Sequence, residues 1–193
     1  MTQQSRDVQA WIEGALLGVI AWILGYGITF ALVAPRVRER PIHRIVEALE
    51  GEPATYELVG WVFLNAHFVQ TVFRNVPLIG TFSTTFIGND GFGPSLYVIP
   101  VIMLVLAGMA LAYHQNATSP VAGARAGLGL LPGYALPSVI SVFVFEVTIA
   151  GARGSPDLLP AIVLAGIAYP IVVGIGSATI TGALMQRSSG VSA

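Results

Sequence analysis

The sequence predicts an all-α fold: a polytopic bundle of about five transmembrane helices, with a short interfacial helix and an ordered outer loop. Of the 193 residues, 54% are hydrophobic and only 10% are charged. A soluble domain usually carries about 25% charged residues, so this chain has too few to cover a water-exposed surface. The apolar residues also come in long blocks, which is typical of membrane-spanning helices. We therefore expect a single membrane domain, residues 1–193.

Five apolar segments are expected to cross the bilayer, at residues 8–33, 57–73, 96–114, 121–151 and 158–185. The first is longer than the apolar part of a signal peptide and has no cleavage site after it, so we interpret it as a retained span. Pro120 and Pro156 each follow a serine, a pattern typical of helix starts. Pro132 and Pro137 lie inside the fourth segment and remove backbone donors, so this helix is expected to be kinked.

Two connections are expected to be more than plain loops. Residues 41–50 carry four apolar residues at helical spacing, namely Ile42, Ile45, Val46 and Leu49. They predict a short helix on the inner membrane surface, or one packed on the protein's own loops. Residues 76–95 are apolar and glycine-rich, with a turn signal at residues 89–91. We expect an ordered outer loop here; a re-entrant loop is the alternative.

Small residues recur at a spacing of four in several segments. The pairs are Gly14 and Gly18, Gly123 and Gly127, and Gly129 and Gly133, with a stripe of Gly174, Ala178 and Gly182. Such spacing lets helix backbones approach closely, which matters because lipid gives helices no hydrophobic reason to associate. We interpret these residues as packing sites within the bundle, with a homo-oligomer face as the alternative.

All nine basic residues are arginines, and their distribution predicts an orientation. With five spans, six arginines fall on the side of the first connection and three on the other side. Positively charged loops stay in the cytoplasm, so we expect the N-terminus outside and the C-terminus in the cytoplasm. Trp11 is typical of an interfacial anchor, and Arg125 is expected to reach the lipid headgroups.

Ionisable and amide groups within the apolar segments form the candidate functional cluster. Four polar residues fall at i, i+3, i+4 and i+7 and would share one face of a helix: His67, Gln70, Thr71 and Arg74. Glu13, His67 and Glu146 come from three different segments and lie at similar predicted depth, roughly 5 to 10 Å below the outer surface at about 1.5 Å per residue. The candidate cluster is therefore Glu13, His67, Gln70, Arg74 and Glu146. It is expected to be a structural polar clasp, a proton or ion relay, or a set of groups that never meet.

Several kinds of chemistry have no signal in the sequence. There is no cysteine, so disulfides and thiolate metal sites are excluded. Phosphate-binding loops, paired-histidine motifs and nucleophile elbows are absent as well, and a net charge of −1 offers no basic patch for nucleic acid. We therefore expect no enzyme activity, no cofactor, no metal and no nucleic-acid partner.

The stretch GWVFLNAHFV, residues 60–69, carries a resemblance to a family. Around Asn65 to Val69, and in its arrangement of spans, the chain resembles an uncharacterised family of small multi-span membrane proteins of haloarchaea. This resemblance implies an archaeal source and a membrane location, and no activity, cofactor or catalytic residue.

Two hypotheses for function follow. The first is a non-enzymatic membrane protein, either a scaffold or a subunit of a membrane assembly, whose partners are the lipid bilayer, other membrane proteins or further copies of itself. The second is a small transporter or channel that uses the polar layer of Glu13, His67 and Glu146 beside the proline-kinked helix. An intramembrane enzyme or cofactor carrier is a third, weaker alternative.

Overall fold

The computed structural model describes residues 3–41, 44, 47–48, 54–88 and 91–191. Contacts divide the chain into two compact units. The first unit comprises residues 1–23, 100–137 and 166–193; the second comprises residues 24–99 and 138–165. Four long helical segments contribute residues to both units. The four residues expected to form the apolar face of an interfacial helix lie outside the described residues.

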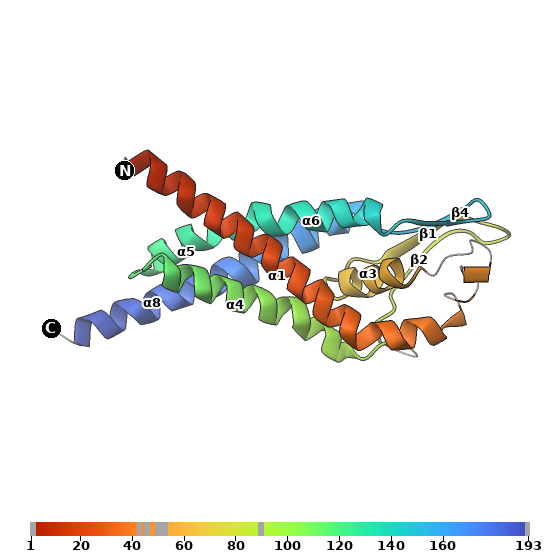
Figure 1. Cartoon of the computed structure of the whole chain (residues 1–193), viewed down its shortest axis with the longest axis horizontal. Coiled ribbons are helices and arrows are strands. Elements are labelled where there is room, and N and C mark those ends of the chain that lie inside the picture. Colours follow the sequence, from red (N-terminus) through yellow and green to blue (C-terminus); the bar gives the residue numbers. More distant parts are fainter. Residues whose placement is uncertain (1–2, 42–43, 45–46, 49–53, 89–90, 192–193) are drawn as a thin grey trace. The chain divides into compact units, whose positions relative to one another are not determined.

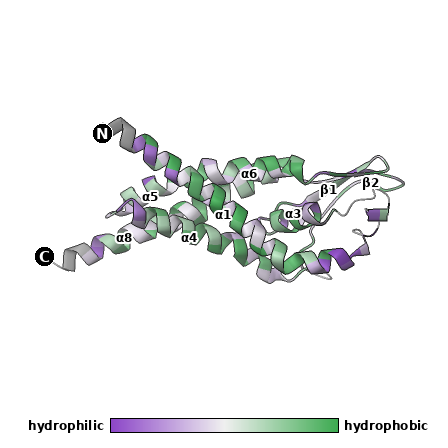
Figure 2. Ribbon diagram, viewed as in Figure 1, coloured by the Kyte–Doolittle hydropathy of each residue, from purple (hydrophilic) through white to green (hydrophobic). Residues whose placement is uncertain are grey.

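Within the described ranges, four helical segments are long and apolar enough to cross a membrane: Asp7–Glu39, Pro94–His114, Pro120–Val144 and Leu158–Ser188. They comprise α1 (Gln3–Glu39), η1 with α4 (Pro94–Tyr97, Val98–His114), α5 with α6 (Pro120–Leu128, Leu130–Val144), and α7, η2, η3 and α8 (Leu158–Pro160, Ala161–Ala168, Pro170–Ile175, Gly176–Val191). Figure 2 shows hydrophobic residues along most of α4 and α6, whereas hydrophilic residues gather toward the C-terminal end of α1.

The segment Pro120–Val144 is interrupted just before Pro132, in agreement with the expected kink, whereas Pro137 lies inside the continuous helix α6. α5 ends at Leu128 and α6 begins at Leu130, with Gly129 between them. Pro132 has no amide hydrogen to donate to Leu128, four residues earlier, so the interruption falls where the proline removes a helical hydrogen bond. In the segment Leu158–Ser188, η2 and η3 are wound as π-helices, a form that is rare beyond a single turn.

The prediction of a span at residues 57–73 is wrong. Helix α3 covers only Thr55–Asn65, which is 11 residues and about 16 Å at 1.5 Å per residue, whereas the hydrocarbon core is about 30 Å thick. The chain then turns and continues as a β-strand. Nine of the 11 residues of α3 are buried, so protein surrounds this helix on nearly all sides.

A four-stranded antiparallel sheet in the second unit also corrects the all-α prediction. The strands are β1 (Thr71–Val76), β2 (Gly80–Thr84), β3 (Val147–Ile149) and β4 (Ala152–Pro156). Their order is β2-β1-β4-β3, and Figure 1 shows β1, β2 and β4 side by side. The expected outer loop at residues 76–95 is therefore partly a hairpin, formed by β1 and β2. The β3–β4 turn places Ala150 and Gly151 at φ 48° and 87°, the geometry of a tight two-residue hairpin.

Aromatic rings form the core of the second unit around α3. Trp61 is 1% exposed and Phe63 is fully buried. The indole N–H of Trp61 donates to the carbonyl oxygen of Phe145 at 2.6 Å, and its ring stacks on Phe86 with centroids 6.0 Å apart. A Cβ at Gly154 of β4 would lie 2.8 Å from the Trp61 ring, so the glycine makes room for the indole.

Backbone-to-backbone contacts hold the helices of the first unit together. A Cβ at Gly14 of α1 would lie 2.6 Å from the Cα of Gly129, and one at Gly133 would collide with the Ala15 backbone. Gly123 and Gly127 of α5 face α8 and η3 in the same way. The interpretation of the small residues as internal packing sites is thereby confirmed: the paired glycines face other helices of this chain, and Gly182 faces the α4–α5 connection.

Candidate functional site

The expected stripe of polar groups on one helix face is not formed. It required a helix through Arg74, but α3 ends at Asn65 and residues from Thr71 onward are a strand. Successive side chains of a strand point to opposite faces, so the helical spacing no longer brings these residues together. His67 is fully buried, whereas Gln70 and Arg74 are exposed.

The two carboxylates of the predicted cluster have separate local partners. Glu13 lies in the first unit, whereas His67 and Glu146 lie in the second. Glu13 is 3.7 Å from the Nε2 atom of His114, and Glu146 is 3.9 Å from a guanidinium nitrogen of Arg153. Both pairs are partly exposed to solvent, which differs from the buried clasp that was one of the three expected arrangements.

The remaining polar residues of the predicted cluster stabilise the sheet. Arg74 stands directly opposite Arg153 in the β1–β4 register, an arrangement that is unfavourable for like charges. Arg74 donates to the Ser155 hydroxyl at 3.1 Å, while Arg153 pairs with Glu146, so each arginine has a partner of its own. Gln70 accepts a hydrogen bond from Ser83 of β2 at 2.9 Å.

His67 is a neutral structural residue in the turn that follows α3. Its Nδ1 atom lies 2.9 Å from the Phe63 carbonyl oxygen, which can only accept, so Nδ1 carries the proton. The imidazole also stands edge-on to the Phe63 ring, with centroids 4.9 Å apart. Burial lowers the pKa of His67 to about 4, although the hydrogen bond to Phe63 opposes the shift. The ring is therefore uncharged at neutral pH.

Asn65 is the residue of this region that sequence reasoning missed. Its side-chain amide donates to the Val69 carbonyl at 2.6 Å, and its oxygen accepts from the Phe86 amide at 2.7 Å. The residue is 1% exposed, so both bonds form away from water. Asn65 thus connects the end of α3 to the segment before β1 and to the segment after β2. The sequence did carry one sign of this role, because a side-chain amide within an apolar helix needs hydrogen-bond partners.

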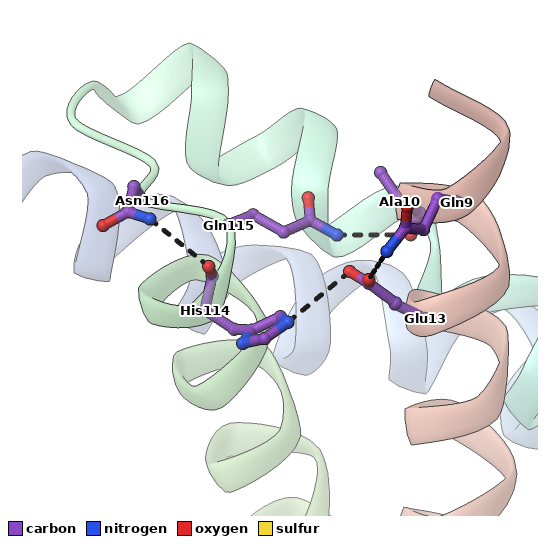
Figure 3. A network of polar contacts seen from close by, with 6 residues as sticks. All are labelled: Gln9, Ala10, Glu13, His114, Gln115 and Asn116. Carbon is purple, nitrogen blue, oxygen red and sulfur yellow. Dashed lines mark hydrogen bonds and ion pairs between the residues drawn. The ribbon is translucent and has the colours of Figure 1, made fainter. Parts of the chain in front are cut away.

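A polar network joins α1 to the end of α4 in the first unit (Figure 3). The Glu13 carboxylate accepts a hydrogen bond from Gln9 at 3.0 Å and faces His114 with its other oxygen. One residue further along the chain, the Gln115 amide donates to the Ala10 carbonyl at 3.2 Å. These contacts hold the α4–α5 connection against the first turns of the α1 span.

Beside this network lies a pocket of about 610 Å³. It is formed by α1, the α4–α5 connection and α5, and is lined by Asp7, Ala10, Trp11, Gln115, Asn116, Ala117, Ala122, Arg125, Ala126, Leu128 and Gly129. Its volume is in the usual range for small-molecule sites. Both charge signs, two amides and one large aromatic ring line the same space, so the pocket can hold a ligand that is polar on one side and apolar on the other.

The second unit holds a smaller, mainly apolar cavity of about 190 Å³, lined by Val37, Arg40, Pro41, Leu58, Val62, Phe86 and Phe92. The guanidinium of Arg40 lies 5.2 Å from the centroid of the Phe92 ring, a cation–π contact. Among the described residues, no group of three or more His, Asp or Glu side chains could hold a metal ion.

Comparison with known families assigns the chain to one family. The model of a family of unknown function, DUF7978, matches residues 1–188. The chain belongs to this family. No curated protein and no solved structure matches the chain. Membership of a family of unknown function agrees with the predicted resemblance to an uncharacterised family; the haloarchaeal source stays a prediction, and the family's description says nothing of membranes.

Proposed function

We propose that this chain is a non-enzymatic, four-span integral membrane protein that serves as a subunit of a membrane assembly, with its β1–β2 hairpin (residues 71–84) as the docking element. The observation that carries the proposal is the exposure of the hairpin tip. Leu78 is 108% exposed and Ile79 is 66% exposed. Two adjacent aliphatic side chains in solvent contribute nothing to the stability of the hairpin itself, whereas a partner chain would bury them.

The outer edge of β2 supports the same proposal. β2 is an end strand of the sheet, and within the described ranges no strand pairs with its other side. Its sequence, GTFST, contains no charged residue and no proline, which are the usual protections against pairing with another chain. An extended segment of a partner could add to this edge by main-chain hydrogen bonds, with Leu78 and Ile79 at its end.

Orientation forms part of the proposal. Four crossings return the chain to its starting side, so both termini would share one side, in contrast to the expected opposite sides. Six of the nine arginines lie in or beside the connections at residues 36–94 and 144–158. Positively charged connections favour the cytoplasm. We therefore place the sheet in the cytoplasm and both termini outside.

The transporter alternative loses its support, since it depended on a shared layer of Glu13, His67 and Glu146. The first of these pairs with His114, the second is neutral and bonded to Phe63, and the third pairs with Arg153. Within the part of the chain that the structure describes, no specific contact favours transport over assembly.

Site-specific photo-cross-linking in native membranes tests the docking element. A benzophenone side chain at position 79 should form one discrete protein adduct, either with a second copy or with another protein. The matched control is position 148, an exposed residue of β3 at the opposite edge of the sheet. Leu78→Asp should abolish the adduct without changing thermal stability. Equal adducts at both positions, or lipid adducts alone at position 79, would overturn the proposal.

Orientation is testable because the chain contains no cysteine. Thr81 in β2 and Thr118 in the α4–α5 connection are both exposed and can each be replaced by a single cysteine. A membrane-impermeant maleimide should label the Thr118→Cys variant in intact cells and the Thr81→Cys variant only after lysis. The reverse pattern would invert the proposed topology, and labelling of both in intact cells would exclude it.

A further inference from the structure

The pocket of the first unit has a composition that points to a ligand. Asp7 and Arg125 both line it and are exposed. Within the part of the chain that the structure describes, neither side chain forms a hydrogen bond or an ion pair. Two opposite charges that share a pocket without partners of their own are suited to a ligand that carries both charges.

Each of the two charged residues is suited to one charged group of a ligand. The Arg125 guanidinium can donate two parallel hydrogen bonds to a phosphate or carboxylate. Trp11, which is 50% exposed, lines the same pocket as Asp7, and a carboxylate and an indole ring are each suited to an ammonium group. Asn116 and Gln115 add amide groups for the uncharged part of a ligand.

One wall of the pocket is held by a hydrogen bond, and the pocket lies near the start of two candidate spans. The hydrogen bond from Gln115 to Ala10 joins two residues of its lining, as Figure 3 shows. Asp7 begins one candidate span, and Pro120, five residues before Arg125, begins another. In the four-span arrangement proposed above, this end of the helices would lie near the lipid headgroups.

We propose that this pocket binds a zwitterion that carries a phosphate and an ammonium group, with the phosphate at Arg125 and the ammonium at Asp7 and Trp11. A phospholipid headgroup and a free phosphorylated amine share this chemistry. The proposal does not depend on the assembly function, because it concerns the other unit.

Native mass spectrometry of the delipidated protein tests the proposal. Phosphatidylethanolamine should bind at least about tenfold more tightly than phosphatidylglycerol, which lacks the ammonium group and so cannot form a charge-assisted hydrogen bond to the Asp7 carboxylate. Asp7→Asn should remove this preference, and Arg125→Gln should weaken binding of both lipids. Arg187→Gln, a matched change outside the pocket lining, should alter neither.

Free O-phosphoethanolamine distinguishes the two sources of the ligand. Binding of the free compound with the affinity of the lipid, lost in Arg125→Gln, would support the site and assign it to a soluble zwitterion. Weak binding of the free compound beside tight binding of the lipid would assign it to a headgroup. Unfolding curves of each variant, expected to match the wild type, show that lost binding reflects the pocket. Equal affinity for both lipids, or no effect of Asp7→Asn, would overturn the proposal.

Discussion

The two units of this chain are held together by different means. In the first unit, glycines at positions 14, 123 and 133 bring helix backbones into contact. In the second unit, aromatic rings fill the space around α3, with Trp61 and Phe63 at its centre. Glycine contacts suit helices in lipid, where burying apolar surface gives little advantage. Aromatic packing suits a core that is sealed from water.

The two kinds of packing should respond to different kinds of substitution. A backbone contact between glycines tolerates no added atom, so the first unit should be sensitive to small additions. A core of interlocking rings is sensitive to loss of volume, so the second unit should be sensitive to deletion. Substitutions of both kinds, one in each unit, test this contrast.

Trp61→Ala should destabilise the protein by about 3–5 kcal/mol, because it leaves a large cavity in the second unit. Trp61→Phe retains most of the volume and removes the hydrogen bond to Phe145, so it should cost only about 1–2 kcal/mol. Chemical unfolding in detergent measures both values. Equal losses for the two variants would mean that the hydrogen bond, and not the volume, stabilises this core.

Acid should destabilise the second unit through His67, by a few kcal/mol. Its pKa is about 4 in the folded protein, against 6.5 for an unperturbed histidine. As the pH falls below 6.5, the unfolded chain takes up a proton before the folded chain does. The stability that the neutral ring provides is complete above about pH 6.5 and is lost as the pH falls toward 4.

His67→Gln provides the comparison for this pH dependence. Between pH 6.5 and 4, its unfolding free energy should change less steeply than that of the wild type, whatever its absolute stability. Thermal unfolding across this range is the measurement. An unchanged slope would show that other groups cause the acid sensitivity.

Gly133→Ala should cost about 1–3 kcal/mol, since the added carbon meets the Ala15 backbone, which cannot move aside. Gly176→Ala is the matched control in the same unit, because no atom outside the local helix lies within 4 Å of its added carbon. That control should be neutral or stabilising by up to about 1 kcal/mol, as alanine favours helix more than glycine does. Melting temperatures in detergent compare the two, and similar values would contradict tight backbone packing.

Gln115→Ala should have a small effect, about 1 kcal/mol, because it removes one partly buried hydrogen bond to Ala10. Glu13→Gln should cost still less, since an exposed pair contributes about 0–1 kcal/mol, and this one is an ion pair only while the His114 imidazole is protonated. Both values come from unfolding curves at low and high salt. Only the Glu13 variant should lose its difference from the wild type as salt increases.

The long apolar runs of the sequence predict the four helical segments, and Pro132 predicts the interruption between α5 and α6, whereas Pro137 lies inside α6. The error at residues 57–73 has a physical cause. A helix that protein surrounds on nearly all sides has the same all-round apolar sequence as a helix in lipid. The apolar run also continues past Asn65 into β1, through Val72 and Phe73, so the end of the helix was hidden.

The sequence carries only a weak signal for the sheet. Residues 147–149 are two β-branched aliphatics around a threonine, followed by an Ala-Gly turn, and residues 80–84 contain threonine, phenylalanine and serine. These short runs predict strands only when their partners are known. β1 pairs with β4, which lies two candidate spans further along the chain, and no local pattern encodes that pairing.

The polar pocket was predictable only in part. Arg125 and Trp11 were expected near the membrane surface, whereas Asp7, Gln115 and Asn116 had no distinguishing pattern. The pocket forms because two regions distant in sequence, the start of α1 and residues 115–129, meet around the contact between Gly14 and Gly129. The depths expected for Glu13, His67 and Glu146 depended on a five-span arrangement, and a chain with four spans would place every residue after the first span differently.

The pairing of β1 with β4 sets an order of events during synthesis. Ribosomes deliver β1 first, and its second neighbour emerges only after two further spans have been made. Until then, one side of β1 has no strand beside it, and the nascent chain presents it to chaperones and proteases. With the sheet on the cytoplasmic side, as proposed, a chain whose second or third span fails to insert would leave β1 in that state permanently. Cytoplasmic chaperones and proteases could then detect the failed insertion of a later span by binding the unpaired β1 strand.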